Sequence, residues 1–147
     1  RLLDEYRYYA AELPSDDKNS IKSWRSKDPY YGYNLDLTGD RNKVHWAHYF
    51  DRPGYEAVSM YEGGCLYEYG VWRPEYISCM EDNRPYYNAP SREAIVRRIM
   101  RASGKTFNME DFISKDKIRS EKGAPQTRTD YVTEAFVPFA PPIRVER

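Results

Sequence analysis

The stretch RLLDEYRYYAAEL, residues 1–13, determines how the rest of the chain is interpreted. Its apolar residues recur at intervals of three and four, the spacing of one face of a helix: Leu2, Leu3, Tyr6, Tyr9, Ala10 and Leu13. Pro14 disfavours the helical conformation at the residue before it, so the predicted helix ends near Leu13. Nothing at its start resembles an N-cap, and we expect the helix to begin before Arg1.

The size and charge of the chain exclude several classes of function. Its 147 residues fit one domain with a modest core. The 23 basic residues are balanced by 23 acidic ones, and no basic stripe is visible. We therefore expect no nucleic-acid partner. No apolar run is long enough for a membrane span.

Tyrosine dominates the apolar composition, with 15 Tyr beside 5 Phe and 3 Trp. A tyrosine ring can be buried while its hydroxyl keeps a polar partner, so tyrosine suits half-buried surfaces and clefts. Two interpretations are open: a loop-rich domain whose core consists of amphipathic rings, or a tyrosine-lined groove for a polymeric ligand.

The remaining pattern predicts an α+β, loop-rich fold. Residues 14–34 are polar and are expected to form a long loop, followed by a short strand at 35–37 and a helix over about 40–50. Residues 55–80 are typical of extended structure with glycine turns. Asn88 or Ser91 can cap a helix that stops at Gly104, and Asn108 can cap another short helix.

Few residues suggest chemistry when each is taken alone. His45 and His48 are spaced i and i+3 and could share a metal, but as an unsupported pair they fit ordinary surface or packing histidines better. The sequence Glu62-Gly63-Gly64 fits a simple glycine turn. Cys65 and Cys79 could form a disulfide or stay buried thiols, and the disulfide is slightly favoured.

Six motifs taken in order along the chain are more specific. They are Leu3–Tyr6, Val44–Trp46, Tyr61–Gly64, Gly70–Pro74, Cys79–Met80 and the helix Pro90–Met100. Together they resemble the IgA-peptidase family of zinc metallopeptidases, in the version found in gut Bacteroidetes. The resemblance covers about residues 1–115. It implies the C-terminal subdomain of a metzincin-like peptidase catalytic domain, with 116–147 as a charged linker and a proline-rich docking tail.

The resemblance also implies where the metal site lies. In that family, a helix with His-Glu and a second His, the zinc-binding signature, precedes the Leu-x-Asp-Glu-Tyr segment. The catalytic residues are thus expected upstream of Arg1, and none is expected in this chain. Asp4 is the candidate third ligand to one zinc ion, with Glu5 as the alternative. If Asp4 follows the second histidine by about seven residues, a straight helix would place it about 10 Å away along the axis, so the chain must bend for Asp4 to reach the metal. Without such a bend, Asp4 or Glu5 would instead orient a histidine ligand.

Further roles follow from the same resemblance. Met80 would form the methionine turn beneath the metal. The substrate cleft would include Tyr61, Glu62, Gly63, Gly64 and Arg73. Here Arg73 would bind a substrate carbonyl or carboxylate, or pair with Glu62. Many family members have cysteines near the segment equivalent to 88–91, whereas this chain has none there, so no disulfide pairing can be transferred.

The expected function is zinc-dependent endopeptidase activity of the intact parent protein, secreted or periplasmic, acting on a protein or peptide substrate. This chain alone should be inactive, and its partner would be the N-terminal remainder of the same protein. The alternative is a non-catalytic glycan- or peptide-binding module with a tyrosine-rich surface. A degenerate, inactive homologue is a third interpretation.

Overall fold

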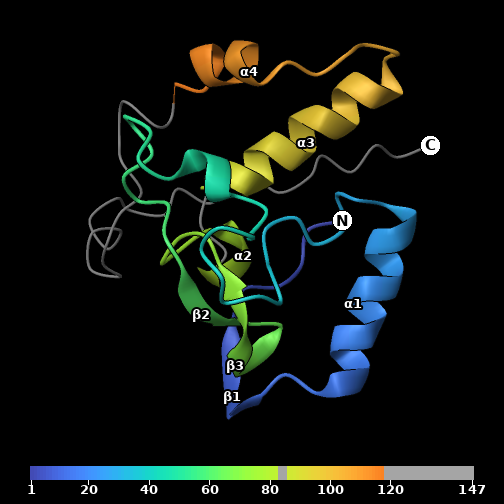
Figure 1. Ribbon diagram of the computed structural model, residues 1–147, viewed down its shortest axis with the longest axis vertical. Coiled ribbons are helices and arrows are strands. Elements are labelled where there is room, and N and C mark those ends of the chain that lie inside the picture. Colours follow the sequence, from blue (N-terminus) through green and yellow to red (C-terminus); the bar gives the residue numbers. More distant parts are fainter. Residues whose placement is uncertain (83–85, 118–147) are drawn as a thin grey trace, which may run out of the picture.

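The computed structural model describes residues 1–82 and 86–117, and it confirms the mixed α+β class (Figure 1). The described residues form strands β1 (Arg7–Glu12), β2 (Tyr61–Gly64) and β3 (Leu66–Arg73), and helices α1 (Ser15–Lys27), α2 (Cys79–Asp82), α3 (Ala89–Ala102) and α4 (Met109–Lys115). A 3-10 helix covers Ala47–Tyr49. The expectations for the tail, residues 118–147, lie outside the described part of the chain.

The three strands form one small sheet with the order β1-β3-β2. β2 and β3 are an antiparallel hairpin, whereas β1 pairs with β3 in parallel, with Arg7 beside Leu66 and Glu12 beside Tyr69. A parallel pair needs a long crossover connection. Here α1 and the irregular segment 28–60 supply it, so this segment passes over the sheet and forms much of the core.

The prediction of a helix over residues 1–13 was wrong. Residues 1–6 have no regular structure and β1 follows them. The Glu5 N–H donates to the Met80 carbonyl (2.8 Å), and the Leu13 N–H donates to the Tyr69 carbonyl (2.9 Å). These long-range bonds and the strand preference of tyrosine favour an extended chain. They outweigh the helical spacing of the apolar residues, which no N-cap supports.

The long loop predicted over residues 14–34 contains α1 instead. Asp16 and Asp17 occupy its first turn and Arg25 and Lys27 its last, an arrangement that favours a helix through its dipole. Ile21 is the one buried residue of this helix. The helix therefore needs no apolar stripe, and its sequence has no periodic apolar pattern. The Arg25 side chain fastens the helix to the next loop by donating to the carbonyl oxygens of residues 31, 32 and 35.

The helix predicted over 40–50 is largely a series of turns that ends in the 3-10 helix. The Asp40 side chain accepts a hydrogen bond from the Asn42 N–H, which starts the turn. Val44, Trp46 and Tyr49 are buried, whereas Ala47 and Phe50 are half-buried. The strand predicted at 35–37 is reduced to an isolated bridge between Asp36 and Trp72.

The predicted starts of the last two helices are confirmed. Asn88 caps α3 by accepting from the Ser91 N–H, with Pro90 in the first turn. Asn108 caps α4 by accepting from the Asp111 N–H. Past the end of α3, Gly104 has a positive φ of 69°, as expected of a helix stop.

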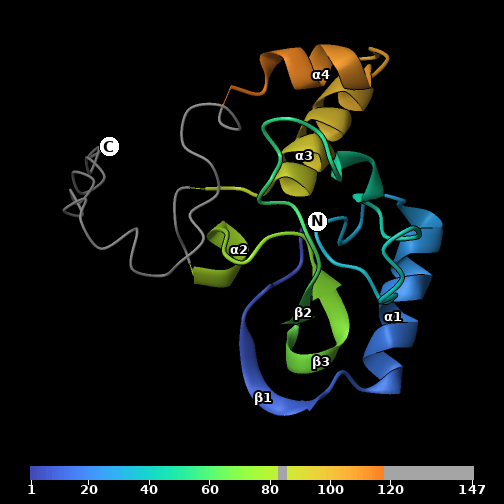
Figure 2. The ribbon, with the colours of Figure 1, turned by 60° about the vertical axis from the view of Figure 1, so that its left-hand side comes forward.

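Two apolar clusters hold these elements together. The larger lies under α3 and α4 and contains Val44, Trp46, Tyr49, Tyr55, Val58, Ala89, Phe112 and Ile113. The smaller joins α1 to the sheet through Leu13, Ile21, Leu35 and Val71. Figure 2 shows the resulting arrangement, with α3 and α4 at one end, the sheet at the other and α1 alongside.

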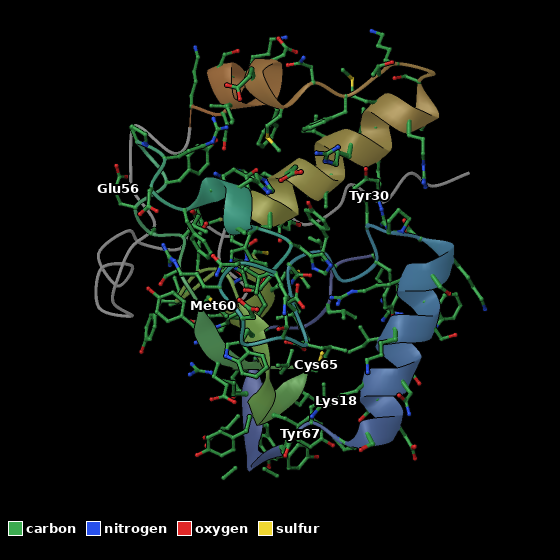
Figure 3. All side chains as sticks on the ribbon, viewed as in Figure 1. Lys18, Tyr30, Glu56, Met60, Cys65 and Tyr67 are labelled. Carbon is green, nitrogen blue, oxygen red and sulfur yellow. The ribbon has the colours of Figure 1, made fainter. Side chains whose placement is uncertain are left out.

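Cys65 and Cys79 are both free thiols, so the slightly favoured disulfide is not formed. Cys65 lies between β2 and β3 with a positive φ of 50° and packs against the smaller cluster, between the sheet and α1 (Figure 3). Burial raises the pKa of its thiol to about 11. Within the described residues, no helix has the length and hydrophobicity of a membrane span.

The hairpin turn gives a first prediction. Gly63 has a φ of 106°, and a Cβ there would lie 2.5 Å from Cδ of Arg7 and 3.3 Å from the Glu68 carbonyl oxygen. We expect Gly63→Ala to lower the free energy of unfolding by about 2–4 kcal/mol, because backbone strain and overpacking add. Urea denaturation measures the change.

Gly104→Ala is the matched control. Its φ of 69° is also positive, but nothing lies within 4 Å of the added Cβ. We expect a loss of about 1 kcal/mol from backbone strain alone. Equal losses in the two variants would contradict the packing of Arg7 against the hairpin.

Candidate functional site

A buried carboxylate, that of Glu5, connects three segments that are far apart in the sequence. Its side chain is fully buried. Oε1 accepts hydrogen bonds from the amide nitrogens of Asn34 (2.6 Å) and Asn88 (2.7 Å), and Oε2 accepts from the Ser78 hydroxyl (2.6 Å). The segment before β1, the loop after α1, the turn before α2 and the cap of α3 therefore meet at one side chain.

The surroundings of Glu5 favour its protonated form. Burial is the main cause and raises its pKa to about 7, although the three hydrogen bonds act in the opposite direction. The nearby carboxylate of Glu75 adds to the rise. All three donors are uncharged. They satisfy the hydrogen bonds of the oxygens, but they do not offset the cost of burying the negative charge as a bonded cation would.

Main-chain hydrogen bonds bring the predicted metal-site residues to the same place. The Glu5 N–H donates to the Met80 carbonyl, and the Cys65 N–H donates to the Asp4 carbonyl, both at 2.8 Å. The Met80 N–H in turn donates to the Ser78 hydroxyl oxygen (3.1 Å). The Asp4-Glu5 segment thus lies between the turn that contains Met80 and the end of the β2–β3 hairpin.

Asp4 and Glu5 have opposite exposures. The Asp4 side chain is exposed, and its Oδ1 accepts a hydrogen bond from the Tyr6 N–H (2.8 Å), which turns the chain into β1. Within residues 1–82 and 86–117, no group of three His, Cys, Asp or Glu side chains is placed to hold a metal ion. Asp4 can therefore offer one carboxylate ligand, and further ligands would have to come from outside these residues.

Arg73, a predicted cleft residue, is only 1% exposed. Its Nη1 donates to the carbonyl oxygens of Glu62 (2.7 Å) and Gly63 (3.1 Å). Burial, and then the nearby charge of Arg7, lower the pKa of its guanidinium to about 10. Arg73 thus contacts the Glu62 main chain, whereas the Glu62 carboxylate accepts from the Gly70 N–H.

The other predicted cleft residues lie along β2. Tyr61 is half-buried, with its ring edge-on to Tyr76, and Glu62 is exposed, with Oε1 accepting from the Gly70 N–H (3.0 Å). The space beside Gly63 is filled by Arg7, and that beside Gly64 by Leu35. Of these four, Tyr61 and Glu62 are the residues whose side chains reach the surface.

The two histidines bind different carboxylates. Nδ1 of His45 lies 3.0 Å from Oδ2 of Asp36, and Nε2 of His48 lies 2.8 Å from Oε2 of Glu93. Burial acts to raise the pKa of each carboxyl group, but the hydrogen bonds and charge of its histidine keep that pKa below the ordinary value. In Glu93, Arg97 contributes in the same direction.

Several buried polar residues could not be identified from the sequence. Asn34, Ser78 and Glu93 are fully buried, as is Glu75, which accepts hydrogen bonds from the Tyr86 hydroxyl and the Ala89 N–H. Asn88 was predicted as a cap, but its second role as a donor to Glu5 has no local signal. These partners are separated by long stretches of chain, so a single sequence does not pair them.

Compared with models of protein families, with curated proteins and with solved structures, the chain gives no significant match. The similarity to IgA peptidases therefore stays a prediction from short motifs. The function has to be inferred from the contacts described above.

The buried carboxylate predicts a pH dependence of stability. With a pKa of about 7 when folded and near 4.5 when unfolded, Glu5 stabilises the fold below pH 4.5. That contribution is lost as the pH rises through 7, and it amounts to about 3 kcal/mol. Glu5→Gln keeps a neutral side chain of the same shape, so it should remove this part of the pH dependence.

Urea denaturation at pH 5 and pH 8 provides the measurement. We expect the wild-type free energy of unfolding to fall between these pH values by about 2–3 kcal/mol more than that of Glu5→Gln. Glu62→Gln, which alters an exposed carboxylate nearby, should behave like the wild type. An identical pH profile for Glu5→Gln and wild type would show that Glu5 is not buried as described.

Proposed function

We propose that this chain is the C-terminal subdomain of a zinc-dependent endopeptidase that hydrolyses peptide bonds in protein substrates. One observation carries the proposal. Asp4 and Glu5, the candidate metal ligands, are hydrogen-bonded through their main chains to Cys65, which follows the proposed cleft residues 61–64, and to Met80, the proposed methionine turn. Asp4 and Cys65 are 61 positions apart and Glu5 and Met80 are 75 apart, so these contacts come from the fold and not from neighbouring positions in the chain.

The arrangement supports Asp4, rather than Glu5, as the third protein ligand to one zinc ion. Asp4 is exposed, whereas both oxygens of Glu5 already accept hydrogen bonds from within the chain. Residues 1–6 are not helical, which is compatible with a bend before position 4. Glu5 would then fix the backbone that presents Asp4, through the Met80 carbonyl and the Asn34 and Asn88 amides.

Zinc bound by three protein ligands acidifies its water and polarises a peptide carbonyl. Within this chain, Asp4 contributes a carboxylate, and the turn at Met80 holds the Asp4-Glu5 segment in place. Tyr61 and Glu62 form the exposed part of the cleft wall. The two histidine ligands and the general-base glutamate belong to the proposed N-terminal remainder of the same protein. The chain alone is therefore expected to be inactive, and the intact protein to be secreted or periplasmic.

Zinc content of the intact parent protein tests the role of Asp4. We expect about one zinc per molecule by mass spectrometry of the metal, together with chelator-sensitive hydrolysis of casein. Asp4→Ala should lower zinc affinity and activity by at least about tenfold, because one of three protein ligands is lost.

Asp16→Ala is the control for that experiment. Asp16 is an exposed carboxylate in the first turn of α1 and has no role in the proposed site, so its replacement should leave zinc content and hydrolysis unchanged. Full zinc content and activity in Asp4→Ala would remove Asp4 from the metal ligands. A parent that binds no zinc would reject the peptidase proposal.

A second candidate function is a non-catalytic module that binds glycans or peptides. Its support is a tyrosine surface on β1, its lead-in and β3, where Tyr6, Tyr8, Tyr9 and Tyr69 are 46%, 70%, 47% and 51% exposed. The rings of Tyr8 and Tyr9 contact each other, and Tyr9 also contacts Tyr67. Exposed rings of this kind can stack against sugars or apolar side chains.

Binding of soluble polysaccharides, measured by affinity electrophoresis, separates this candidate from the peptidase. If the module interpretation is correct, Tyr8→Ala should weaken binding by about fivefold, because an exposed aromatic contact contributes on the order of 1 kcal/mol. Trp24→Ala removes another exposed aromatic ring, on α1 and outside the tyrosine surface, and should have no effect. The tyrosine surface would be rejected as a glycan site if polysaccharides retarded Tyr8→Ala as much as the wild type. It would also be rejected if they did not retard the wild type.

A further inference from the structure

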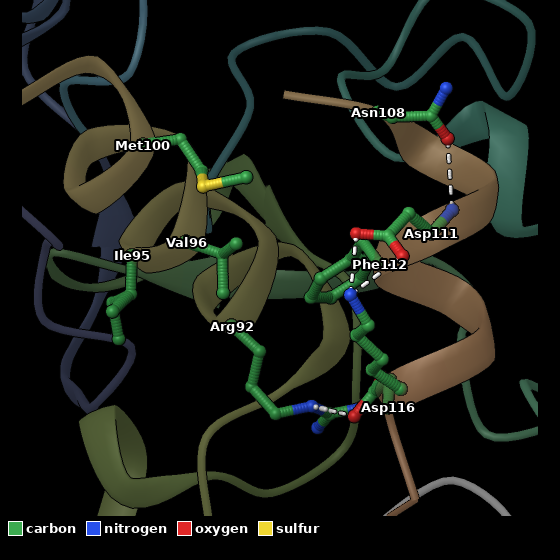
Figure 4. Close-up of a pocket in the computed structure, with 9 residues that line it drawn as sticks. Arg92, Ile95, Val96, Met100, Asn108, Asp111, Phe112 and Asp116 are labelled. Carbon is green, nitrogen blue, oxygen red and sulfur yellow. Dashed lines mark hydrogen bonds and ion pairs between the residues drawn. The ribbon is translucent and has the colours of Figure 1, made fainter. Parts of the chain in front are cut away.

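An apolar groove of about 450 Å³ lies between α3 and α4. Val96 and Met100 on α3 and Phe112 on α4 point toward the space between the helices (Figure 4). Ile95 lines the same groove and is 36% exposed, although a large aliphatic side chain is usually buried. The groove is thus an apolar surface that the described residues leave partly uncovered.

The polar end of the groove is held together by an ion pair and lies where the described chain stops. Arg92 donates from Nε and Nη2 to both carboxylate oxygens of Asp116, at 3.0 and 2.8 Å. Asp116 Oδ2 also accepts from the Tyr55 hydroxyl (2.9 Å). Both Arg92 and Asp116 line the groove, and the chain continues from Lys117 directly beside them. Whatever follows position 117 therefore starts at the mouth of the groove.

The sequence beyond this point contains one strongly apolar run, AFVPFAPPI, residues 135–143. Phe136, Val137, Phe139 and Ile143 supply side chains that suit a pocket lined by Ile, Val, Met and Phe. Its three prolines restrict the backbone to extended conformations, so such a segment loses little entropy on binding. Proline also lacks an N–H, which makes a groove lined by side chains a better site than a sheet edge.

We propose that the segment 135–143 binds in the groove between α3 and α4 of its own chain. This inference does not depend on the peptidase proposal, because it uses neither Asp4 nor the metal. Phe136 and Phe139 occupy the space between Val96, Met100 and Phe112, and the tail covers Ile95.

The connecting chain has a suitable length for this contact. Residues 118–134 are mostly polar or charged in sequence. A chain of this length without regular structure has a root-mean-square span of about 20–25 Å. From Arg92 to Met100, α3 rises about 12 Å, so the whole groove lies within reach of the linker. A tether of this length gives an effective concentration in the millimolar range, which favours the same chain over a second copy.

Photo-cross-linking of the 147-residue chain tests the proposal. The probe is p-benzoylphenylalanine in place of Phe139, a substitution that keeps an aromatic ring, and the products are mapped by mass spectrometry. We expect cross-links to α3 and α4 around Val96, Met100 and Phe112. Cross-links confined to β1, α1 or another surface, or no cross-link at all, would overturn the proposal.

Two glutamate variants on α3 form a matched pair. Ile95→Glu places a charge in the groove and should reduce the cross-link yield at least fivefold. Ile99→Glu changes the same residue type one turn further along α3, at a position that is 60% exposed and outside the groove lining, and should leave the yield unchanged. Equal yields in the two variants would overturn the assignment of the groove.

Isotope labelling distinguishes the tail of the same chain from that of a second copy. In an equimolar mixture of ¹⁴N- and ¹⁵N-labelled chains, binding within one chain gives cross-linked peptides of a single isotope. Peptides that combine both isotopes would show exchange between copies and contradict the proposal. Circular dichroism of every variant confirms that loss of a cross-link is not loss of the fold.

Discussion

The structure depends on the burial of one carboxyl group, that of Glu5, among uncharged donors. An unsatisfied buried carboxylate would be strongly destabilising, so the amides of Asn34 and Asn88 and the hydroxyl of Ser78 must stay in place. Each donor belongs to a different segment. Glu5 therefore fixes three segments relative to β1, the strand that follows it. These segments are the loop after α1, the turn before α2 and the start of α3.

This constraint explains how a chain with a small sheet and much irregular structure can present a defined site. The backbone on either side of Glu5 has little freedom, because the carbonyl of Asp4 and the N–H of Glu5 are both hydrogen-bonded to distant residues. Asp4 itself faces solvent. In the proposed peptidase, this anchored backbone would orient the Asp4 carboxylate before the ion arrives.

Elements with local signals could be predicted from the sequence, and those held by distant contacts could not. Asn88 and Asn108 cap their helices through residues three positions away, so α3 and α4 were correctly placed. In residues 1–13 the helical spacing was real, but hydrogen bonds to Met80 and Tyr69 favour an extended chain. α1 was missed because it buries one residue and has no apolar stripe.

The same distinction applies to the candidate site. The motif order along the chain predicts a shared site for Asp4, Met80 and residues 61–64, and that site stays a prediction. In the fold, the Asp4 carbonyl accepts from the Cys65 N–H, and the Glu5 N–H donates to the Met80 carbonyl. The burial of Arg73 and the partners of Glu5 had no counterpart in the sequence, because they arise from the packing of segments up to 83 residues apart.

The most direct test of this account is an NMR titration of the Glu5 side-chain carboxyl carbon in the ¹³C-labelled chain. A fully buried group held by neutral donors should titrate with a midpoint of about 7. A midpoint near the ordinary value of 4.5 would contradict the account, since it would mean that Glu5 is in contact with water and does not join the three segments.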